Sequence, residues 1–292
     1  MKALTNSFTT RSEQGYEVYV LSNDCVEVEI VPELGTRIIS LKDLRTGREW
    51  LWHPPQGMKL FRNRPEDGFC QSPLVGIDEC FPTIAPCTWQ GRQLPDHGEL
   101  WNLPWTVDED LWSSGILKTT ARTKLSPFEF VRSIELDQNE IRFDYQLTNR
   151  GAASERFLWA MHPLLRLEAG DQLDLPSPTR ALFNGETWVD QIASAVPKNH
   201  CAKIFAAPVS EGWAAVHNPL TRDRLQIEWD TEENNSLGLW LSRGGWHGHH
   251  HFAIEPTNCA ADELSSAAAS DQCGVLAGHA SKGWRVCFRV GS

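Results

Sequence analysis

Residues 130–148, FVRSIELDQNEIRFDYQLT, decide the fold class of this chain. Apolar and polar side chains alternate through residues 130–136 and again through residues 140–148, with DQN between the two runs. A period of two is typical of a strand with one buried face, and a short polar connection between two such runs indicates a β-hairpin. The same alternation recurs in residues 16–21, 25–31, 37–41, 213–217, 224–229, 237–242 and 284–290. We therefore expect an all-β protein.

Helical patterns are short and few in this chain. No stretch of about 12 residues repeats apolar side chains at the spacing of an amphipathic helix, and the best candidates are residues 187–195 and 262–269. Neither a Pro-rich or Gly/Ser-rich linker nor an internal repeat divides the sequence, so we expect one domain over residues 1–292. Residues 50–112 are dense in Pro, Gly, Trp and His, and long irregular segments of this kind often carry function in β-proteins.

The composition excludes several classes of protein. Lys and Arg number 27 against 38 Asp and Glu, a net charge of −11, which argues against nucleic acid and anionic membranes as partners. The first 20 residues are polar and no window approaches the ~18 apolar residues of a membrane helix, so we expect a soluble, cytoplasmic protein. None of the 8 cysteines forms a CxxC pair, and we expect them to be mostly reduced. The 13 tryptophans indicate an aromatic core, a ligand cleft, or both.

Three segments carry side chains suited to chemistry. They are LPDHGELWNLPW (94–105) with His97, FLWAMHPLLRL (157–167) with His162, and GWHGHHHFAIEPTNCAADEL (245–264) with Glu255. Each also has a structural interpretation, because a lone His in an apolar strand is often a hydrogen-bonded core residue and a Glu before Pro often ends a strand.

The third segment also contains a histidine cluster that suggests a metal site: His247, His249, His250 and His251. Strand alternation, however, sends His249 and His251 to one face and His250 to the other. No Cys or carboxylate accompanies them at a recognised ligand spacing, so we expect no metal.

Taken together, these segments resemble the aldose 1-epimerase (galactose mutarotase-like) family nearly from end to end. The resemblance rests on EIVPELGTRIISLKD (29–43), DHGELW (96–101), WAMHPLLRL (159–167) and AIEPTNCAADEL (253–264), and on the order and spacing of the two histidines and the glutamate. It implies a β-supersandwich, a single domain of large antiparallel sheets with a concave sugar-binding cleft. It also implies that Glu255 is the general base, His162 the general acid, and His97 a second histidine that places the sugar.

Further residues follow from the same resemblance. The family's sugar-binding arginine, which precedes the first histidine, corresponds to Arg62 or Arg64, and the sequence does not choose between them. Trp101 and Trp246 flank the motifs as stacking platforms, whereas Trp159 lies at an odd offset from His162 and is expected in the core. Trp50, Trp52, Trp229, Trp240 and Trp284 lie in strand-like segments and are expected to pack.

The segment GIDECFPTIAPCTW (76–89) departs from the best-known mutarotase pattern and marks a divergent subgroup. Asp78 and Glu79 in it are either substrate-binding groups or parts of a turn held by carboxylate–backbone hydrogen bonds.

The chemistry implied is the interconversion of the α and β anomers of a hexose or hexose derivative. One group removes the proton of the C1 hydroxyl while another protonates the ring oxygen, and the open aldehyde recloses from its other face. This needs no cofactor, and the expected partner is a small sugar, bound by a monomer or homodimer. Two alternatives remain: a non-catalytic carbohydrate-binding protein on the same fold, and a glycosidase or lyase in which Asp78 or Glu79 partners Glu255.

Overall fold

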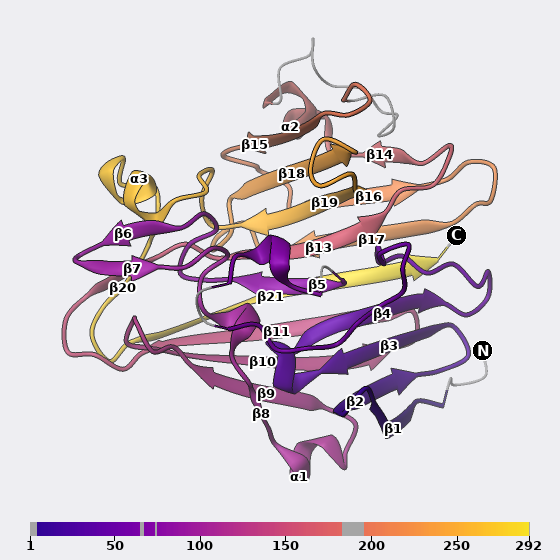
Figure 1. Cartoon of the computed structure of the whole chain (residues 1–292), viewed down its shortest axis with the longest axis horizontal. Coiled ribbons are helices and arrows are strands. Elements are labelled where there is room, and N and C mark those ends of the chain that lie inside the picture. The colour runs from indigo at the N-terminus through magenta and orange to yellow at the C-terminus, as the bar shows by residue number, and fades with distance from the viewer. Residues whose placement is uncertain (1–4, 65–66, 74, 183–195, 292) are drawn as a thin grey trace.

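Two large antiparallel sheets make up most of the computed structural model, which describes residues 5–64, 67–73, 75–182 and 196–291 (Figure 1). The nine-stranded sheet contains, in spatial order, β1 (Ser7–Glu13), β2 (Tyr16–Ser22), β3 (Val26–Val31), β4 (Arg37–Asp43), β5 (Ile77–Cys80), β13 (Ala160–Arg166), β19 (His250–Thr257), β18 (Ser236–Arg243) and β15 (Cys201–Ala206). The eight-stranded sheet contains β14 (Gln172–Asp174), β16 (Trp213–His217), β17 (Arg224–Trp229), β21 (Ser281–Gly291), β11 (Glu140–Asn149), β10 (Phe128–Asp137), β9 (Leu117–Arg122) and β8 (Thr106–Val107).

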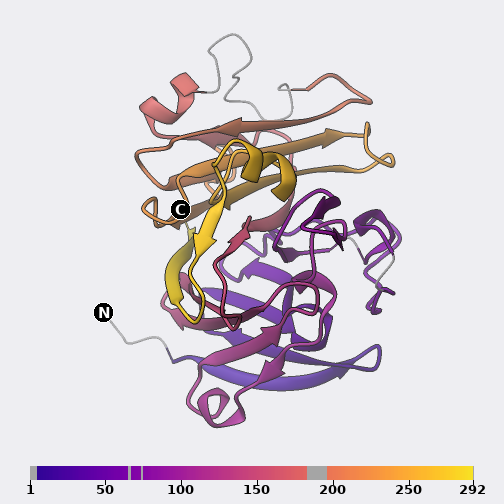
Figure 2. The same cartoon turned by 90° about the vertical axis from the view of Figure 1, so that its left-hand side faces the viewer.

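The remaining elements are short and lie around these sheets. Two small hairpins pair β6 (Cys87–Trp89) with β7 (Arg92–Leu94) and β12 (Glu155–Phe157) with β20 (Gly274–Leu276). The helices are α1 (Glu109–Trp112), α2 (Ser177–Leu182) and α3 (Leu264–Ala269), with 3₁₀ turns η1 (Pro32–Leu34), η2 (Phe69–Gln71) and η3 (Leu100–Asn102). In both views β15, β18 and β19 lie at one end of the molecule and β1–β3 at the other (Figures 1 and 2).

The prediction of an all-β fold is confirmed. The hairpin at residues 130–148 forms as β10 and β11, whose register runs from Phe128 opposite Asn149 to Asp137 opposite Glu140. Gln138 adopts the left-handed conformation in the connection, with φ of 55°. The helix expected at residues 262–269 appears as α3, whereas the one expected at 187–195 lies outside the described residues. Within the described ranges, no helix has the length and apolar character to cross a membrane.

Alternation along the inner strands separates a core face from a second face. On β13 and β19 the side chains of Met161, Leu165, Phe252 and Ile254 belong to the main hydrophobic cluster, together with residues of the eight-stranded sheet such as Phe143 and Phe288. Successive side chains of a strand point to opposite faces. His162 and Glu255 therefore lie on the face that turns away from the sheet–sheet core.

A buried ion pair joins the two sheets through this core. Arg132 of β10 and Glu79 of β5 are both fully buried, with the arginine Nη1 2.7 Å from Oε1 of the carboxylate. Tyr145 Oη and Trp159 Nε1 also donate to this carboxylate, each at 2.8 Å. The Tyr145 ring stacks on Trp284, and the Trp159 ring contacts Trp284 at a tilt, so aromatic rings border the ion pair.

Replacing Arg132 with Met should destabilise the protein by about 3–5 kcal/mol, because the Glu79 carboxylate would remain buried without its counter-charge. Urea unfolding followed by tryptophan fluorescence measures the change. Arg122→Met is the matched control, since Arg122 pairs with Glu129 at the surface and its loss should cost less than ~1 kcal/mol. Equal midpoints for the two variants would contradict the role assigned to the Arg132–Glu79 pair.

Candidate active site

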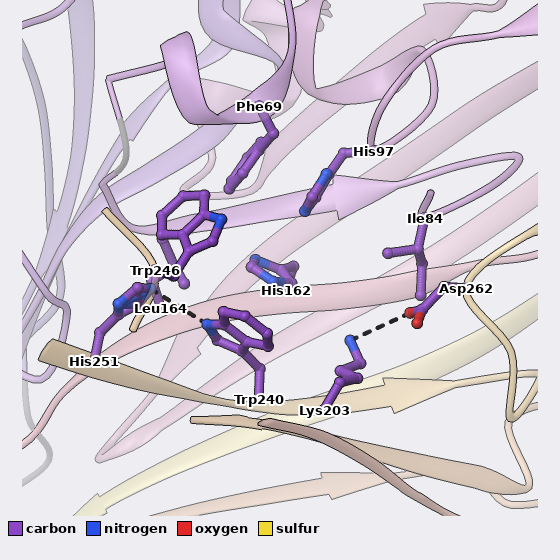
Figure 3. Close-up of a pocket in the computed structure, with 10 residues that line it drawn as sticks. All are labelled: Phe69, Ile84, His97, His162, Leu164, Lys203, Trp240, Trp246, His251 and Asp262. Carbon is purple, nitrogen blue, oxygen red and sulfur yellow. Dashed lines mark hydrogen bonds and ion pairs between the residues drawn. The ribbon is translucent and has the colours of Figure 1, made fainter. Parts of the chain in front are cut away.

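A cavity of about 150 Å³ opens on the outer face of the nine-stranded sheet (Figure 3). This volume is below the ~300–1,000 Å³ typical of pockets for drug-sized ligands, which favours a small ligand. The described residues that line it are Phe69, Ile84, His97, His162, Leu164, Lys203, Trp240, Trp246, His251 and Asp262. They come from β13, β15, β18 and β19 and from the loops above these strands.

The register of β13 against β19 brings His162 and Glu255 together. Ala160 pairs with Thr257 and Leu164 with Ala253, so His162 and Glu255 lie opposite each other between these pairs. The His162 Nε2 and Glu255 Oε1 atoms are 3.6 Å apart. Two residues 93 positions apart in the sequence thus meet at the floor of the cavity.

The Glu255 carboxylate lies directly beneath the cavity lining. Its side chain has no solvent exposure, and Lys203 Nζ donates a hydrogen bond to Oε2. Within the part of the chain that the structure describes, Oε1 of Glu255 and Nδ1 of His162 have no hydrogen-bond partner. Unpartnered buried polar atoms are costly unless a ligand or water satisfies them, so these two atoms mark where a polar ligand would bind.

Burial determines the charge states around the carboxylate. It lowers the pKa of His162 well below the usual value, and the charges of His97 and Lys203 lower it further, so the imidazole is neutral at neutral pH. Burial also opposes the charge of Lys203, but the carboxylates of Glu255 and Asp262 outweigh this effect and raise its pKa. The Lys203 Nζ and Asp262 Oδ1 atoms are 3.7 Å apart.

The motif at residues 96–99 positions His97 over the opposite side of the cavity. Asp96 Oδ1 lies 2.8 Å from His97 Nδ1, and Oδ2 accepts the Phe69 backbone N–H at 2.8 Å. Burial raises the pKa of Asp96, but the hydrogen bonds from His97 and the Phe69 backbone outweigh it and the net pKa is lowered. A carboxylate can only accept, so Nδ1 of His97 carries the proton and Nε2 remains for a ligand.

Backbone geometry explains the rest of this motif. His97 has φ of 58° and Gly98 has φ of 70°, and a Cβ on Gly98 would lie 2.0 Å from the Phe81 carbonyl oxygen. Only glycine fits there. The buried Glu99 carboxylate accepts the N–H groups of Lys124 and Leu125, which fixes the following loop.

The tryptophans near the site divide into lining and supporting residues. Trp246 lines the cavity, and its ring meets Trp240 edge to face at 6.3 Å. Trp240, expected to pack in the core, also lines the cavity, because residue 240 faces outward on β18. Trp101 is buried, and its Nε1 donates to the Asp96 carbonyl at 2.9 Å, so it supports the His97 loop from behind. Trp159 lies in the core as expected.

Besides Trp101, four residues predicted to bind substrate do not line this cavity. Asp78 is fully buried and forms an ion pair with Arg37, with the Nε–Oδ1 distance 2.7 Å. Glu79 belongs to the ion pair with Arg132 described above. Arginine side chains hold both carboxylates where backbone groups were expected, and both residues lie in a strand rather than a turn. Arg62 donates to the Glu33 carbonyl and Arg64 pairs with Asp67, and both are largely exposed.

The histidine cluster packs around Trp52 and Trp246. The His249 and His251 rings both contact Trp52, at centroid distances of 4.9 and 5.1 Å, which agrees with their predicted common face. His251 Nε2 accepts a long hydrogen bond from Trp240 Nε1 at 3.4 Å (Figure 3). Among the described residues, no group of three or more His, Cys, Asp or Glu side chains is arranged to hold a metal ion.

Comparison with known proteins agrees with this architecture. A candidate aldose 1-epimerase from Klebsiella pneumoniae superposes with a TM-score of 0.73 at 16% identity, over 98% of this chain and 84% of that one. A galactose mutarotase-like protein from Clostridium acetobutylicum gives a TM-score of 0.70 at 16% identity over 100% of both chains. The chain has the fold of the galactose mutarotase-like proteins. A galactose mutarotase related enzyme from Lactobacillus acidophilus gives 0.65 at 14% identity, over 94% and 97% of the two chains. The sequence itself matches no protein-family model and no curated protein.

The fold confirms the predicted supersandwich. The cavity is also lined by residues that were not predicted from the sequence to belong to the site. These are Phe69, Ile84, Leu164, Lys203, Trp240, His251 and Asp262. A signal for Lys203 existed, because it is the one charged residue in CAKIFA (201–206), an otherwise mostly apolar run. The other lining residues could not be identified from the sequence, because the sequence does not show which face of a strand borders the cavity.

His251 should make stability depend on pH. Burial and then the charges of His249 and His250 lower its pKa to about 3, against about 6.5 in the unfolded chain. The unfolded chain therefore binds the extra proton below pH 6.5, and stability falls as pH falls. Between pH 7.5 and 5 this effect amounts to about 2 kcal/mol.

In His251→Gln that part of the pH dependence should disappear, as measured by urea unfolding at both pH values. His200→Gln, at an exposed site, should retain the wild-type dependence. A His251→Gln variant that loses as much stability as the wild type between the two pH values would contradict the assignment.

Proposed function

We propose that this protein is an aldose 1-epimerase that interconverts the α and β anomers of a hexose or hexose derivative. The observation that carries the proposal is the pairing of Glu255 with His162 at 3.6 Å on the floor of a small cavity, with His97 on the opposite wall. The mutarotase fold supports it, although at 14–17% identity this likeness concerns the fold alone.

The reaction needs a base next to the anomeric hydroxyl and a proton donor next to the ring oxygen. Both oxygens are bonded to C1, so the two groups must lie side by side, as the groups around Glu255 do. In this proposal Glu255 accepts the proton of the C1 hydroxyl. The neutral imidazole of His162 and Nε2 of His97 form hydrogen bonds to the sugar and fix the ring over the carboxylate.

The aromatic lining suits the apolar faces of a sugar ring. Trp240 and Trp246 lie on one side of the cavity, while Lys203 and Asp262 lie on another (Figure 3). A pyranose presents C–H groups on its faces and hydroxyls at its edge. Such a ring is complementary to a site in which indole faces and polar groups occupy different walls.

The second candidate function is carbohydrate binding without catalysis. The complete burial of the Glu255 carboxylate favours it, because a substrate hydroxyl reaches Oε1 only if neighbouring side chains shift. A glycosidase has less support, since Asp78 and Glu79 are each held by an arginine and do not line the cavity.

Glu255→Gln should reduce the rate of anomerisation by about 10²–10⁴-fold, because the amide cannot accept the C1 proton. Polarimetry or NMR exchange on freshly dissolved α-anomers measures the rate, and calorimetry measures sugar binding. Glu263→Gln is the matched control, since Glu263 is exposed and should leave the rate unchanged. Retention of wild-type activity by Glu255→Gln would refute the proposal, and sugar binding by a wild type that accelerates no sugar would favour the non-catalytic alternative.

A further inference from the structure

Lys203 lines the cavity, although it lies outside the three segments that contain His97, His162 and Glu255. It belongs to β15, the edge strand of the nine-stranded sheet, where it pairs with Trp240 of β18. Its side chain is only 16% exposed, and its ammonium contacts Glu255 and lies 3.7 Å from Asp262. An ammonium has three N–H donors. One donates to Glu255, and Asp262 is an ion-pair partner without a hydrogen bond, so N–H groups remain for a ligand in the cavity that Lys203 lines.

Gly238 lies on β18, the strand between Lys203 and Glu255. On β18, Trp240 lies opposite Lys203 and Gly238 lies opposite Glu255. A Cβ on Gly238 would approach Glu255 Oε2 to 3.4 Å and Glu255 Cβ to 3.3 Å. Oε2 is the oxygen that Lys203 contacts. A side chain at residue 238 would therefore lie close against the carboxylate that Lys203 contacts.

The proposed reaction requires a proton donor, and His162 is poorly suited to be that donor. Its pKa is well below the usual value, so it holds no extra proton at neutral pH. Lys203, by contrast, is cationic and directly adjacent to the base.

We propose that Lys203 is the general acid of this site and that it works as a pair with Glu255, an inference that rests on the proposed function. In the opening step the O1–H bond breaks and its proton passes to Glu255. The C1=O1 bond forms, and the C1–O5 bond breaks with its electron pair moving to O5. A proton from the Lys203 ammonium then completes the O5 hydroxyl. After rotation about C1–C2, the reverse transfers close the ring and restore both groups.

Charge coupling between the two groups supplies the driving force for this transfer. The negative charge of Glu255 is a main reason that Lys203 keeps its proton. Once Glu255 is protonated by the sugar, that attraction is lost, while burial still disfavours the ammonium. Lys203 therefore becomes a stronger acid at the moment when O5 needs a proton.

Other charged or titratable groups around Lys203 come from three elements. Asp262 follows β19, His162 lies on β13, and Cys80 lies on β5. Burial raises the pKa of Cys80 well above its usual value, so it is neutral, and His162 is neutral as well. Asp262 is the remaining counter-charge, and it is 40% exposed.

The decisive variant is Lys203→Arg, which keeps a cation beside Glu255 but cannot release a proton, because a guanidinium stays protonated in proteins. We expect its kcat for anomerisation to fall by about 10²-fold or more, with sugar binding by calorimetry within a few-fold of the wild type. His162→Gln, which keeps a hydrogen-bonding group but alters sugar positioning, should raise KM and lower kcat by much less than Lys203→Arg does. Lys118→Arg, at a surface ion pair, should match the wild type.

Chemical rescue separates proton donation from a structural role. Lys203→Cys treated with bromoethylamine carries an aminoethyl thioether of nearly the length of lysine, whose amine is more acidic. It should recover kcat, with the basic limb of the pH–rate profile moved to lower pH. The treated wild type is the control, since Cys70 and Cys201 are exposed and also react.

Wild-type kcat in Lys203→Arg would overturn the assignment, and so would a loss in His162→Gln equal to that in Lys203→Arg. Rescue with an unshifted pH profile would also overturn it, since the amine would then act only by its shape and charge. If the wild type itself accelerated no sugar, the proposed function would fail and this inference would fail with it. If the wild type is active and Lys203→Arg keeps that activity, the role of Lys203 is rejected and the proposed function stands.

Discussion

The antiparallel register of β13 against β19 is the constraint on which the rest of the site depends. It fixes His162 opposite Glu255, and it places Leu164 and Ala253 next to them on the same face. A slip by one residue would turn all these side chains into the sheet–sheet core and bring Met161 and Ile254 to the surface. The same alternation that builds the hydrophobic core therefore also selects which polar residues reach the cavity.

Buried carboxylates occur in two different settings in this structure, inside the protein and next to the cavity. Asp78 and Glu79 are neighbours in β5, yet they face opposite sides, and each pairs with its own fully buried arginine. Those two pairs are sealed by surrounding side chains and stabilise the fold. Glu255 differs, because its partners, Lys203 and His162, both line a cavity that a small molecule can enter. A ligand in the cavity can therefore contact the groups that surround the Glu255 carboxylate. Titratable groups with shifted pKa values beside a cavity are typical of functional sites.

The fold and part of the site followed from the sequence because they depend on local patterns and ordered motifs. Alternation predicted the β10–β11 hairpin, and the motifs around His97, His162 and Trp246 led to three residues that line the cavity. Its motif also pointed to Glu255, which lies next to His162 beneath the cavity lining. Trp240 was expected in the core, because period two separates two faces of a strand without saying which one borders a cavity. Lys203 was missed since its place beside Glu255 depends on long-range pairing of β15 with β18 and of β18 with β19.

The most direct test of the account is NMR exchange between the H1 signals of the α and β anomers of reducing hexoses with the wild-type protein. The account predicts that for at least one sugar the exchange rate exceeds the buffer rate in proportion to protein concentration, while the equilibrium anomer ratio does not change. A panel of neutral, 6-deoxy, phosphorylated and sulfonated hexoses in which no exchange rate exceeds that of buffer would contradict it.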